Sequence, residues 1–420
     1  MRKFVALTLI QLGFLVACGG GGYGGGGMTT PPPTQTIATP GPPNVETLTV
    51  DAGPAGGVNT AFVTVTLCAP GSTTACQTID HIEVDTGSIG LRILADAPFT
   101  VALPQETNGS GGPPITECLQ FADGSSYGSL RLADVTLPGS TEHASNVVVQ
   151  LIGDSTYPVP TGSITGQSAC PGTAENTVQA FGANGILGVG PFAQDCGGAC
   201  VASIPPLAGV YYNCPTPSTC VDANASLTQQ VPNPVTLFAT DNNGVIVELP
   251  AVVSAGAVSS AGALVFGIGT RTNNGLGTAT VLPEDPNTGF ITATYKGAAY
   301  TDGYIDSGSN GNFFIDSSLT QCTTATGFYC PASTMSESAT LQGTTATTLA
   351  ANFSVANAEM LFLNTSYTAF SNLGGTIVNP PPASQPQPFD LGLPFFYGHN
   401  VFTAIENANT PGGMGPYFAY

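Results

Sequence analysis

The sequence has very little positive charge. Of its 420 residues only six are lysine or arginine, against 26 aspartates and glutamates, and the formal net charge is −20. Two of the six, Arg2 and Lys3, stand at the extreme N-terminus, and the other four are scattered between positions 92 and 296. A surface that binds nucleic acid needs clustered basic side chains. Nucleic acid is therefore excluded as a partner, and phosphate-rich substrates are disfavoured.

Other residue types are also absent or rare. Tryptophan is missing, charged residues make up 8% of the chain, and the three histidines, His81, His143 and His399, are far apart. The 54 glycines and 35 prolines are too many for a helix-rich protein, while 42% hydrophobic residues are enough for a folded core. The cysteine and histidine spacings match no tetrahedral zinc pattern, so we expect no metal and no cofactor.

The N-terminus is predicted to be a targeting segment. Arg2 and Lys3 precede an apolar run, residues 4–14, that is too short to remain as a transmembrane helix. Residues 15–18, Leu-Val-Ala-Cys, resemble the lipobox of bacterial lipoproteins, in which cleavage precedes an acylated cysteine. An ordinary secretory signal is the alternative. We expect a signal peptide over 1–17, a lipid anchor to a membrane at Cys18, a Gly/Pro-rich tether over 18–50, and export to a bacterial outer membrane or cell surface.

The cysteine count agrees with export. Eleven cysteines less Cys18 leave ten, an even number that suits disulfides in an oxidising compartment. Spacing does not prove connectivity, but four pairs are close in sequence and two cysteines remain to pair with each other. The proposed disulfides are Cys68/Cys76, Cys196/Cys200, Cys214/Cys220, Cys322/Cys330 and Cys118/Cys170.

From residue 58 onward, short runs rich in Val, Ile, Thr and Phe alternate with turn residues, which predicts a mostly-β chain. Helical periodicity is limited to 226–230 and 317–321, the second with Asp316 as its cap. Residues 241–244 indicate a hairpin. The chain is too large for one small sandwich. The clearest predicted strands are 61–67, 79–84, 130–137, 147–152, 245–249, 263–268, 289–295 and 401–405.

One motif occurs twice, about half a chain apart. Residues 81–91 and 303–313 both read apolar–Asp–(Thr/Ser)–Gly–Ser–x–Gly, and their aspartates, Asp85 and Asp306, are 221 positions apart (306 − 85). An apolar run containing glycine follows each copy, at 185–190 and at 389–396. A single Asp-Thr-Gly is weak evidence, because such tripeptides are common at turns. Two extended copies, each with its own apolar-glycine run, are much more specific.

This arrangement resembles the pepsin-like aspartic peptidases, in which each of two β lobes donates one Asp-(Thr/Ser)-Gly loop to a cleft between them. The resemblance covers about residues 58–420. It implies a bilobal pepsin-like fold with two β-barrel-like lobes, the first over 51–230 and the second, with the inter-lobe strands, over 231–420. Strands that join the lobes are expected at 234–238 and 262–267. The pattern also resembles a group of secreted bacterial lipoproteins. No activity is carried over from that group to this sequence.

The resemblance implies a role for each residue of the two loops. Asp85 and Asp306 are the expected catalytic pair. Two carboxylates about 3 Å apart do not both ionise cheaply, so they share one proton. The ionised member then takes a proton from water, and the protonated member bonds to the scissile carbonyl. The expected supporting groups are the N–H groups of Gly87 and Gly308 on the inner carboxylate oxygens, the hydroxyls of Ser88 and Ser309 on the outer oxygens, and the hydroxyls of Thr86 and Ser307 between the loops.

Residues 120–130 resemble the flap hairpin that closes over an extended peptide in that family. Three departures from the family pattern stand out. Phe121 replaces the usual flap tyrosine and so removes a hydroxyl from the cleft, Arg92 occupies a region where tryptophan is frequent, and Asp390 interrupts the second apolar-glycine run. The expected flap residues are Phe121, Gly124, Ser125 and Tyr127.

Two alternatives stay open beside an aspartic endopeptidase acting on an extended peptide or protein at acidic pH. Residues 124–128 match the Gly-x-Ser-x-Gly pattern of serine hydrolases, but a strand-like segment follows where that motif needs a helix. The other alternative keeps the fold without catalysis, as a lipid-tethered scaffold or a binder of peptide or carbohydrate. Phe121 favours it, and the intact pair of Asp85 and Asp306 opposes it.

Overall fold

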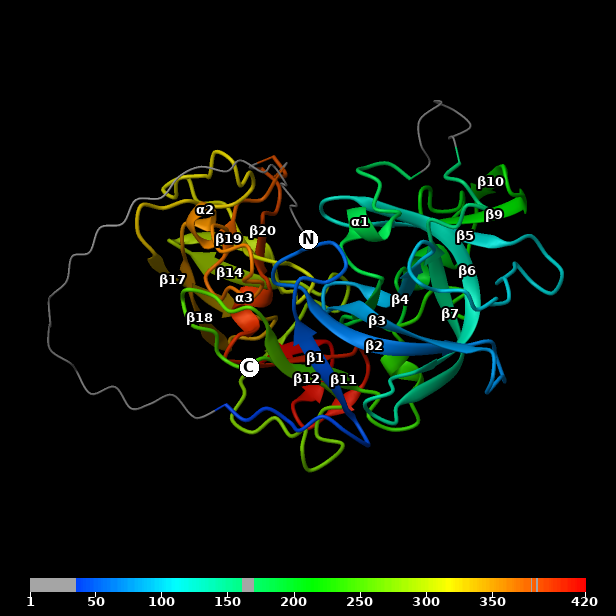
Figure 1. Cartoon of the computed structure of the whole chain (residues 1–420), viewed down its shortest axis with the longest axis horizontal. Helices are drawn as coiled ribbons and strands as arrows, with labels where there is room; N and C mark the ends of the chain where they lie inside the picture. Colours follow the sequence, from blue (N-terminus) through cyan, green and yellow to red (C-terminus); the bar gives the residue numbers. More distant parts are fainter. Residues whose placement is uncertain (1–34, 161–169, 379, 383) are drawn as a thin grey trace, which may run out of the picture.

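The computed structural model describes residues 35–160, 170–378, 380–382 and 384–420. The predicted signal peptide, Cys18 and most of the predicted tether lie outside these residues. The described chain is mostly β and bilobal, which confirms the predicted fold class, and the two lobes lie side by side in Figure 1. No helix in the described ranges has the length and apolar character needed to cross a membrane.

The N-terminal lobe is built on one sheet that curls round on itself. Its strands follow the order β10-β9-β5-β6-β7-β4-β8-β3-β2, and β6 also pairs with β2. Strands β4 and β8 are buried at every position, as expected for continuous apolar runs covered on both faces. The elements are β2 (Ala61–Cys68), β3 (Cys76–Asp85), β4 (Ile89–Leu94), β5 (Ile115–Gln120), β6 (Ser125–Thr136), β7 (His143–Ile152), α1 (Val178–Phe181), β8 (Gly185–Val189), η1 (Gly197–Cys200), β9 (Tyr211–Thr216) and β10 (Thr219–Asp222).

The C-terminal lobe repeats part of this plan in a second sheet of order β18-β17-β14-β15-β20-β16-β19. Its core is aromatic, and the rings of Phe314 and Phe389 stack with their centroids 5.3 Å apart. The rings of Tyr295 and Phe353 pack against the same pair. The elements are β14 (Ile291–Tyr295), β15 (Ala298–Ile305), β16 (Asn312–Phe313), β17 (Met335–Gln342), β18 (Thr348–Val355), α2 (Ala358–Leu361), β19 (Gly374–Gly375), β20 (Pro388–Leu391) and α3 (Leu393–Phe396).

A set of strands between the lobes continues the first sheet in the order β2-β1-β12-β11-β21-β24-β13. In Figure 1, β1, β11 and β12 lie at the base of the molecule, between the two lobes. The antiparallel pairing of β1 with β12 covers all six residues of β1. These elements are β1 (Val45–Val50), β11 (Gly244–Glu248), β12 (Ser260–Phe266), β13 (Val281–Pro283), β21 (Asn400–Ala404) and β24 (Tyr417–Ala419), followed by the small hairpin of β22 (Asn409–Thr410) and β23 (Gly413–Met414).

The eight strands expected from the sequence are all present, but several other predictions were wrong. The end of the predicted tether is strand β1, because its apolar residues pack into the inter-lobe sheet. Residues 234–238 were expected as a strand and instead contain the 3₁₀ helix η2 (Pro234–Leu237), capped by Asn233. Proline has no N–H for a sheet and fits the first turn of a helix. No hairpin therefore forms at 241–244, since no strand precedes it.

The two predicted short helices are turns. At 226–230 the N–H groups of Gln229 and Gln230 both bond to the carbonyl of Ser226, and the helix does not continue. At 317–321 Asp316 accepts from the N–H of Ser318 at 2.8 Å, so it caps a turn. Serine and aspartate side chains compete with helical hydrogen bonds through local contacts, which explains why the weak periodicity did not produce helices.

Five disulfides are present, with the pairing proposed from the sequence. Four of them close short loops, and Cys118–Cys170 spans 52 positions from strand β5. The local pairs sit at turns, as Cys68–Cys76 does at the end of the β2–β3 hairpin. The pairs are Cys68–Cys76, Cys118–Cys170, Cys196–Cys200, Cys214–Cys220 and Cys322–Cys330.

Candidate active site

Each repeated motif forms the loop between two strands that are separated by a third. In the N-terminal lobe β8 lies between β3 and β4, parallel to the first and antiparallel to the second. In the C-terminal lobe β20 lies in the same way between β15 and β16. Strands β8 and β20 come from the two apolar-glycine runs. The internal duplication of the sequence is therefore a duplication of structure, and it brings an aspartate to the same place in each lobe.

Glycine is required where the apolar runs pass the loops. A Cβ atom added at Gly188 would lie 2.7 Å from the backbone nitrogen of Ile89. One added at Gly392 would overlap the carbonyl oxygen of Gly311. Real Cβ atoms do not approach backbone so closely, because the contact is below the sum of the atomic radii. The glycines let β8 and β20 pass directly against the two loops that carry Asp85 and Asp306.

The two aspartates have the same hydrogen-bond partners. Asp85 accepts from the N–H of Gly87 at 2.7 Å and from the hydroxyl of Ser88 at 2.6 Å, on different carboxylate oxygens. Asp306 accepts from Gly308 at 2.8 Å and from the hydroxyl of the serine that follows it at 3.1 Å. Residues expected from the sequence to support the carboxylates thus contact them, on the expected inner and outer oxygens.

The middle residues of the two loops join the lobes. The N–H of Thr86 donates to Ser307 Oγ at 3.1 Å, and the N–H of Ser307 donates to Thr86 Oγ1 at 2.9 Å. Each hydroxyl then donates across the interface, Thr86 to the carbonyl of Ile305 at 3.1 Å and Ser307 to that of Val84 at 2.7 Å. These four bonds are buried, so they hold the loops in one relative position.

The two carboxyl groups lie against each other. A Cβ atom at Gly87 would be 2.6 Å from Cγ of Asp306, and one at Gly308 would be 2.6 Å from Cγ of Asp85. Asp85 is 4% exposed and Asp306 is 2% exposed. Burial first, and the charge of Asp85 second, raise the pKa of Asp306. The pair therefore keeps a proton at a pH where an ordinary aspartate has lost it.

A cavity of about 360 Å³ opens in front of the pair. Its lining includes both aspartates, the flap residues 119–122 and residues 288–290 of the C-terminal half. Asp195 is a third acid in the wall, and the lining that the described residues form contains no lysine or arginine. The sequence carries no motif signal for most of the aromatic wall, because its rings come from loops far apart in the chain. These aromatic residues are Phe121, Phe192, Phe290, Tyr304 and Phe418.

The expected flap residues all lie in the β5–β6 hairpin, but they do not all face the cleft. Phe121 lines it, with its ring edge-to-face against Phe181 at 6.0 Å, and its N–H closes the turn on the carbonyl of Gly124 at 2.8 Å. Gly124 ends the turn and Ser125 begins strand β6, and neither is in the lining. Tyr127 is 2% exposed, and its hydroxyl lies 2.7 Å from that of Thr116. Tyr127 therefore does not replace the missing flap hydroxyl.

The serine-hydrolase pattern at 124–128 does not form a nucleophile elbow. Its central serine, Ser126, is fully buried in strand β6 and donates to the carbonyl of Glu175 at 3.1 Å. An elbow needs an exposed hydroxyl on a turn between a strand and a helix. This alternative is therefore wrong.

A buried ionic cluster behind the cleft was not found by motif reasoning. Arg92 is 0% exposed and donates to Glu117 at 2.8 Å, to Asp195 at 2.9 Å and to Gln150 at 3.1 Å. Tyr211 donates to the other oxygen of Asp195 at 2.6 Å. Burial first, then the charge of Glu117, raise the pKa of Asp195. Because Glu117 belongs to flap strand β5 and Asp195 to the cleft wall, Arg92 fixes the flap to the wall.

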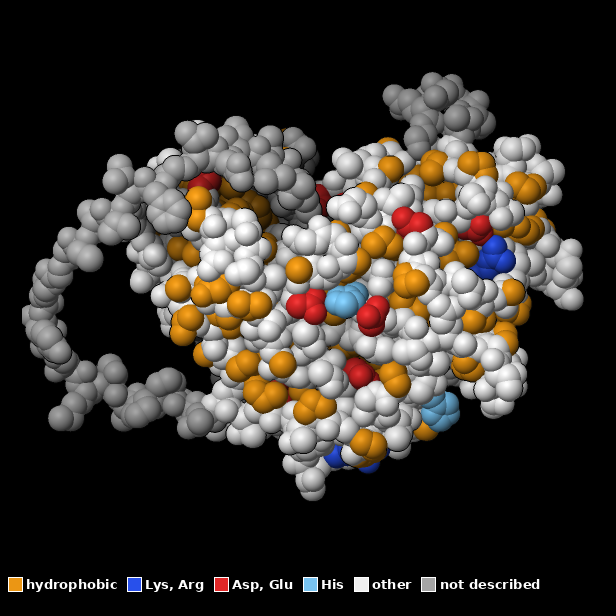
Figure 2. Space-filling view, viewed as in Figure 1, with side chains coloured by type: hydrophobic (Ala, Val, Ile, Leu, Met, Phe, Trp, Pro, Cys, Tyr) orange, Lys and Arg blue, Asp and Glu red, His pale blue; other side chains and the backbone are white. Residues whose placement is uncertain are grey.

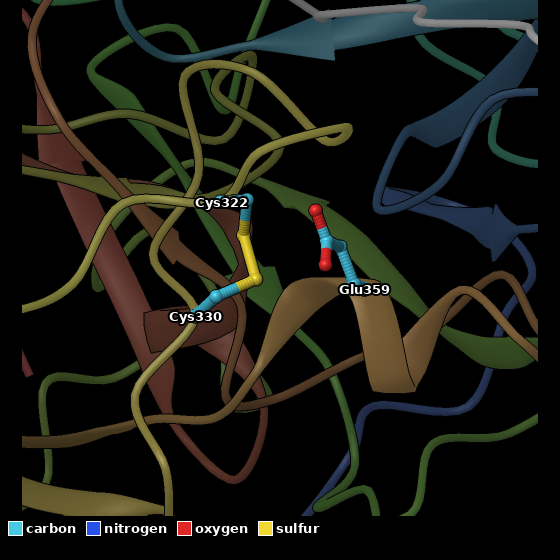
Figure 3. Close-up of side chains that lie close together, drawn as sticks. All are labelled: Cys322, Cys330 and Glu359. Atoms are coloured by element: carbon cyan, nitrogen blue, oxygen red, sulfur yellow. A yellow bond between two sulfur atoms is a disulfide. The ribbon is translucent and has the colours of Figure 1, made fainter.

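One group of acid and cysteine side chains in the described residues has the spacing of metal ligands, namely Cys322, Cys330 and Glu359 (Figure 3). The two sulfurs form a disulfide, so neither is the thiolate that a metal requires. Glu359 accepts from the N–H of Thr324 at 2.6 Å and of Thr323 at 3.0 Å. Hydrogen bonds to the carboxylate lower the pKa of Glu359 to about 2, and the bond from the N–H of Thr324 has the largest effect. The group is a disulfide beside a capped turn.

The fold and the site together define a bilobal, pepsin-like β protein in which each lobe presents one aspartate at a shared cleft. Residues 40–420 match the model of the family described as "Protein of unknown function (DUF3443)", and the chain belongs to this family. No curated protein matches the chain. Among solved structures it is similar to the aspartic proteinase from Irpex lacteus, at 14% identity and a TM-score of 0.46, over 89% of this chain and 96% of that one.

Proposed function

We propose that this protein is an aspartic endopeptidase. The observation that carries the proposal is the pair Asp85 and Asp306, buried, adjacent, and held by matching hydrogen bonds from two loops that are locked together. A structural pair of carboxyls has no need for this symmetry, and a binding protein gains nothing from placing two acids where they repel. A pair that shares one proton supplies a base and an acid at the same point.

The chemistry follows from that shared proton. The ionised carboxyl takes a proton from a water molecule, which attacks the carbonyl carbon of the scissile peptide bond. The protonated carboxyl donates to the carbonyl oxygen, so the tetrahedral intermediate forms without a full negative charge. Proton transfer to the amide nitrogen then allows the carbon–nitrogen bond to break. The apparent pKa values belong to the pair and not to either residue.

The substrate we propose is an extended peptide or protein segment. The cavity runs between the flap turn at 119–122 and the loop at 288–290, and hairpin backbone beside a cleft pairs with extended chains. Among the described residues, aromatic side chains dominate the wall and no lysine or arginine lines it. A lipid anchor at Cys18 would place the enzyme at a membrane surface outside the cytoplasm. That location is part of the proposal and depends on the lipobox-like residues 15–18.

The decisive experiment is cleavage of a denatured protein mixture by the full-length protein in detergent micelles, from pH 3 to pH 8. Asp85→Asn and Asp306→Asn are each expected to lower the rate by about 100-fold or more. Asp222→Asn, at an exposed acid of strand β10 away from the cleft, is the matched control and should retain the wild-type rate. Inhibition by a pepstatin-type peptide is expected only for proteins that cleave. Equal rates in all four proteins would refute the proposal.

Phe121 supports a second candidate, a binder of peptides without catalysis. The flap side chain in the cleft has no hydroxyl, and Tyr127 is turned away. If no variant cleaves at any pH although circular dichroism shows all four folded, peptide binding is measured directly by fluorescence anisotropy. Binding that Phe121→Ala weakens and Asp222→Asn does not would establish this second function.

A further inference from the structure

Strand β20 carries an acid where its counterpart in the other lobe is apolar. Tyr304 lies two residues before Asp306 and is in register with Asp390. Glu83 lies two residues before Asp85 and is in register with Ile186. The duplication therefore makes Asp390 the counterpart of Ile186. One lobe has a hydrocarbon at this place and the other a carboxyl group, although both strands support the same kind of loop.

Asp390 is buried at the cleft side of the C-terminal sheet. Its neighbour Phe389 packs into the aromatic core of that lobe, 5.3 Å from Phe314. Because successive side chains of a strand point to opposite faces, Asp390 points the other way, toward the side of cleft-lining Tyr304. It is 0% exposed, and neither carboxyl oxygen has a hydrogen-bond partner at normal geometry within the described chain. An ionised carboxylate in such a place would be costly.

The nearest part of the proposed active site is the loop of Asp306. The Ser309 hydroxyl, which donates to Asp306 at 3.1 Å, also acts on Asp390 and favours its ionised form. Two larger effects oppose it, because burial and the charge of Asp306 raise the pKa of Asp390 well above its ordinary value. Among the described residues, the other titratable groups that act here are Asp85 and the phenol of Tyr304, and neither carries positive charge. Asp390 is thus a neutral acid with a hydrogen to donate.

We propose that Asp390 is a positioning residue for the catalytic pair. It keeps its proton over the pH range of activity and donates it as a hydrogen bond to Ser309 Oγ. The Ser309 hydroxyl, with one hydrogen of its own, then donates to Asp306 and not to Asp390. A two-step chain, Asp390 to Ser309 to Asp306, fixes the direction of the bond that holds the outer oxygen of Asp306. This inference rests on the proposed peptidase function.

Two variants separate donation from packing. Asn at position 390 keeps an N–H donor of nearly the same size, and leucine keeps the volume without a donor. Asp390→Asn is expected to retain kcat and the pH profile within about threefold. Asp390→Leu is expected to lose about tenfold in kcat with KM unchanged, and to move the whole pH profile upward, because a weaker bond to ionised Asp306 raises its pKa. An unchanged Asp390→Leu profile, or equal damage by both substitutions, would overturn the inference.

A measurement without catalysis separates this inference from the proposed function. Native Asp390 keeps its proton above pH 4, while in the unfolded chain it ionises near its ordinary pKa of about 3.9. Stability is therefore lost as the pH rises, by up to about tenfold per pH unit in the unfolding equilibrium constant. Asparagine does not titrate, so Asp390→Asn is free of this loss. The free energy of unfolding of Asp390→Asn, measured with urea, should therefore increase relative to that of the wild type from pH 4 to pH 7. A difference that stays constant with pH refutes the inference that native Asp390 is protonated, whether or not the protein cleaves. An increasing difference in a protein that never cleaves leaves the buried proton established and refutes the peptidase.

Discussion

Replacing Arg92 by leucine tests how the flap is held to the wall of the cleft. The guanidinium is fully buried, and its removal leaves Glu117 and Asp195 with side chains only 1% and 4% exposed. Their remaining donor in the cluster is the hydroxyl of Tyr211 on Asp195. Two buried acids that shared one cation then face each other without it. We expect the N-terminal lobe to lose stability and the flap strand to lose its attachment.

The expected cost at pH 7 is about 3–5 kcal/mol, the usual result of removing one partner of a buried ion pair. For a lobe of roughly 150–250 residues this lowers the Tm by roughly 6–20 °C. Lys296→Met is the matched control, because Lys296 also pairs with two acids but is 47% exposed. Its acid partners are 6% and 7% exposed, so the two clusters differ mainly in the exposure of the cation, and removal of the half-exposed ammonium should cost less than removal of Arg92 because water screens it. The contrast therefore tests whether burial of the cation is the cause.

The cost of Arg92→Leu depends on pH in a known direction. Burial and the charge of Glu117 already raise the pKa of Asp195 in the wild type. A folded protein in which the pKa of an acid is raised loses stability as the pH increases. The charge of Arg92 lowers the pKa of Asp195, so this loss of stability is larger when the guanidinium is removed. Thermal unfolding followed by near-ultraviolet circular dichroism should therefore give a small deficit at pH 4 and the full deficit at pH 7. A deficit below about 1 kcal/mol at pH 7, or one that is equal at both pH values, would refute this reasoning.

Three further outcomes are expected. Thr86→Val leaves the buried N–H of Ser307 and the carbonyl of Ile305 without their partner, so urea unfolding should show a loss of about 1–3 kcal/mol, and a loss below about 0.5 kcal/mol would contradict it. Gly308→Ala places a Cβ atom 2.6 Å from Cγ of Asp85, so cleavage should fall by about 100-fold while the circular dichroism spectrum is retained. Cys118→Ser with Cys170→Ser opens a loop of 52 positions, and a loss far from about 4 kcal/mol would argue against loop closure as its source.

The site could be predicted from sequence to the extent that it is encoded locally and twice. Asp85 and its three following residues make nearly all their contacts within the loop or with its copy, so the motif contains them. Arg92 shows the opposite case. Its acid partners lie 25 and 103 positions away, and no motif connects them. The available signal was an arginine in the middle of an otherwise apolar strand, which indicates burial and therefore a partner.

The fold shows the same division. The strands follow from β-branched runs between turn residues, and all eight predicted ones exist. The order of strands in the sheets does not follow from such runs, because β1 pairs with β12 more than 200 positions later. Residues 45–50 therefore looked like the end of a tether, since their burial depends on a partner that local composition does not reveal. In segments of weak helical periodicity, side-chain hydrogen bonds determined whether a helix or a turn formed, as at Asp316.

The charge balance of the described residues links the scaffold to the proposed chemistry. Each of their four basic side chains is in an ion pair, and Figure 2 shows only small, separated areas of Lys and Arg on one face. The cleft lining has no base beside Asp85 and Asp306. Burial and the charge of Asp85 raise the pKa of Asp306, so the pair retains a proton to a higher pH than an ordinary aspartate does. If the proposed mechanism holds, cleavage should be fastest at acidic pH and should be lost as the pH rises through the raised pKa of Asp306. An active wild type whose rate stays constant up to pH 9 would show that the pair does not act through a shared proton.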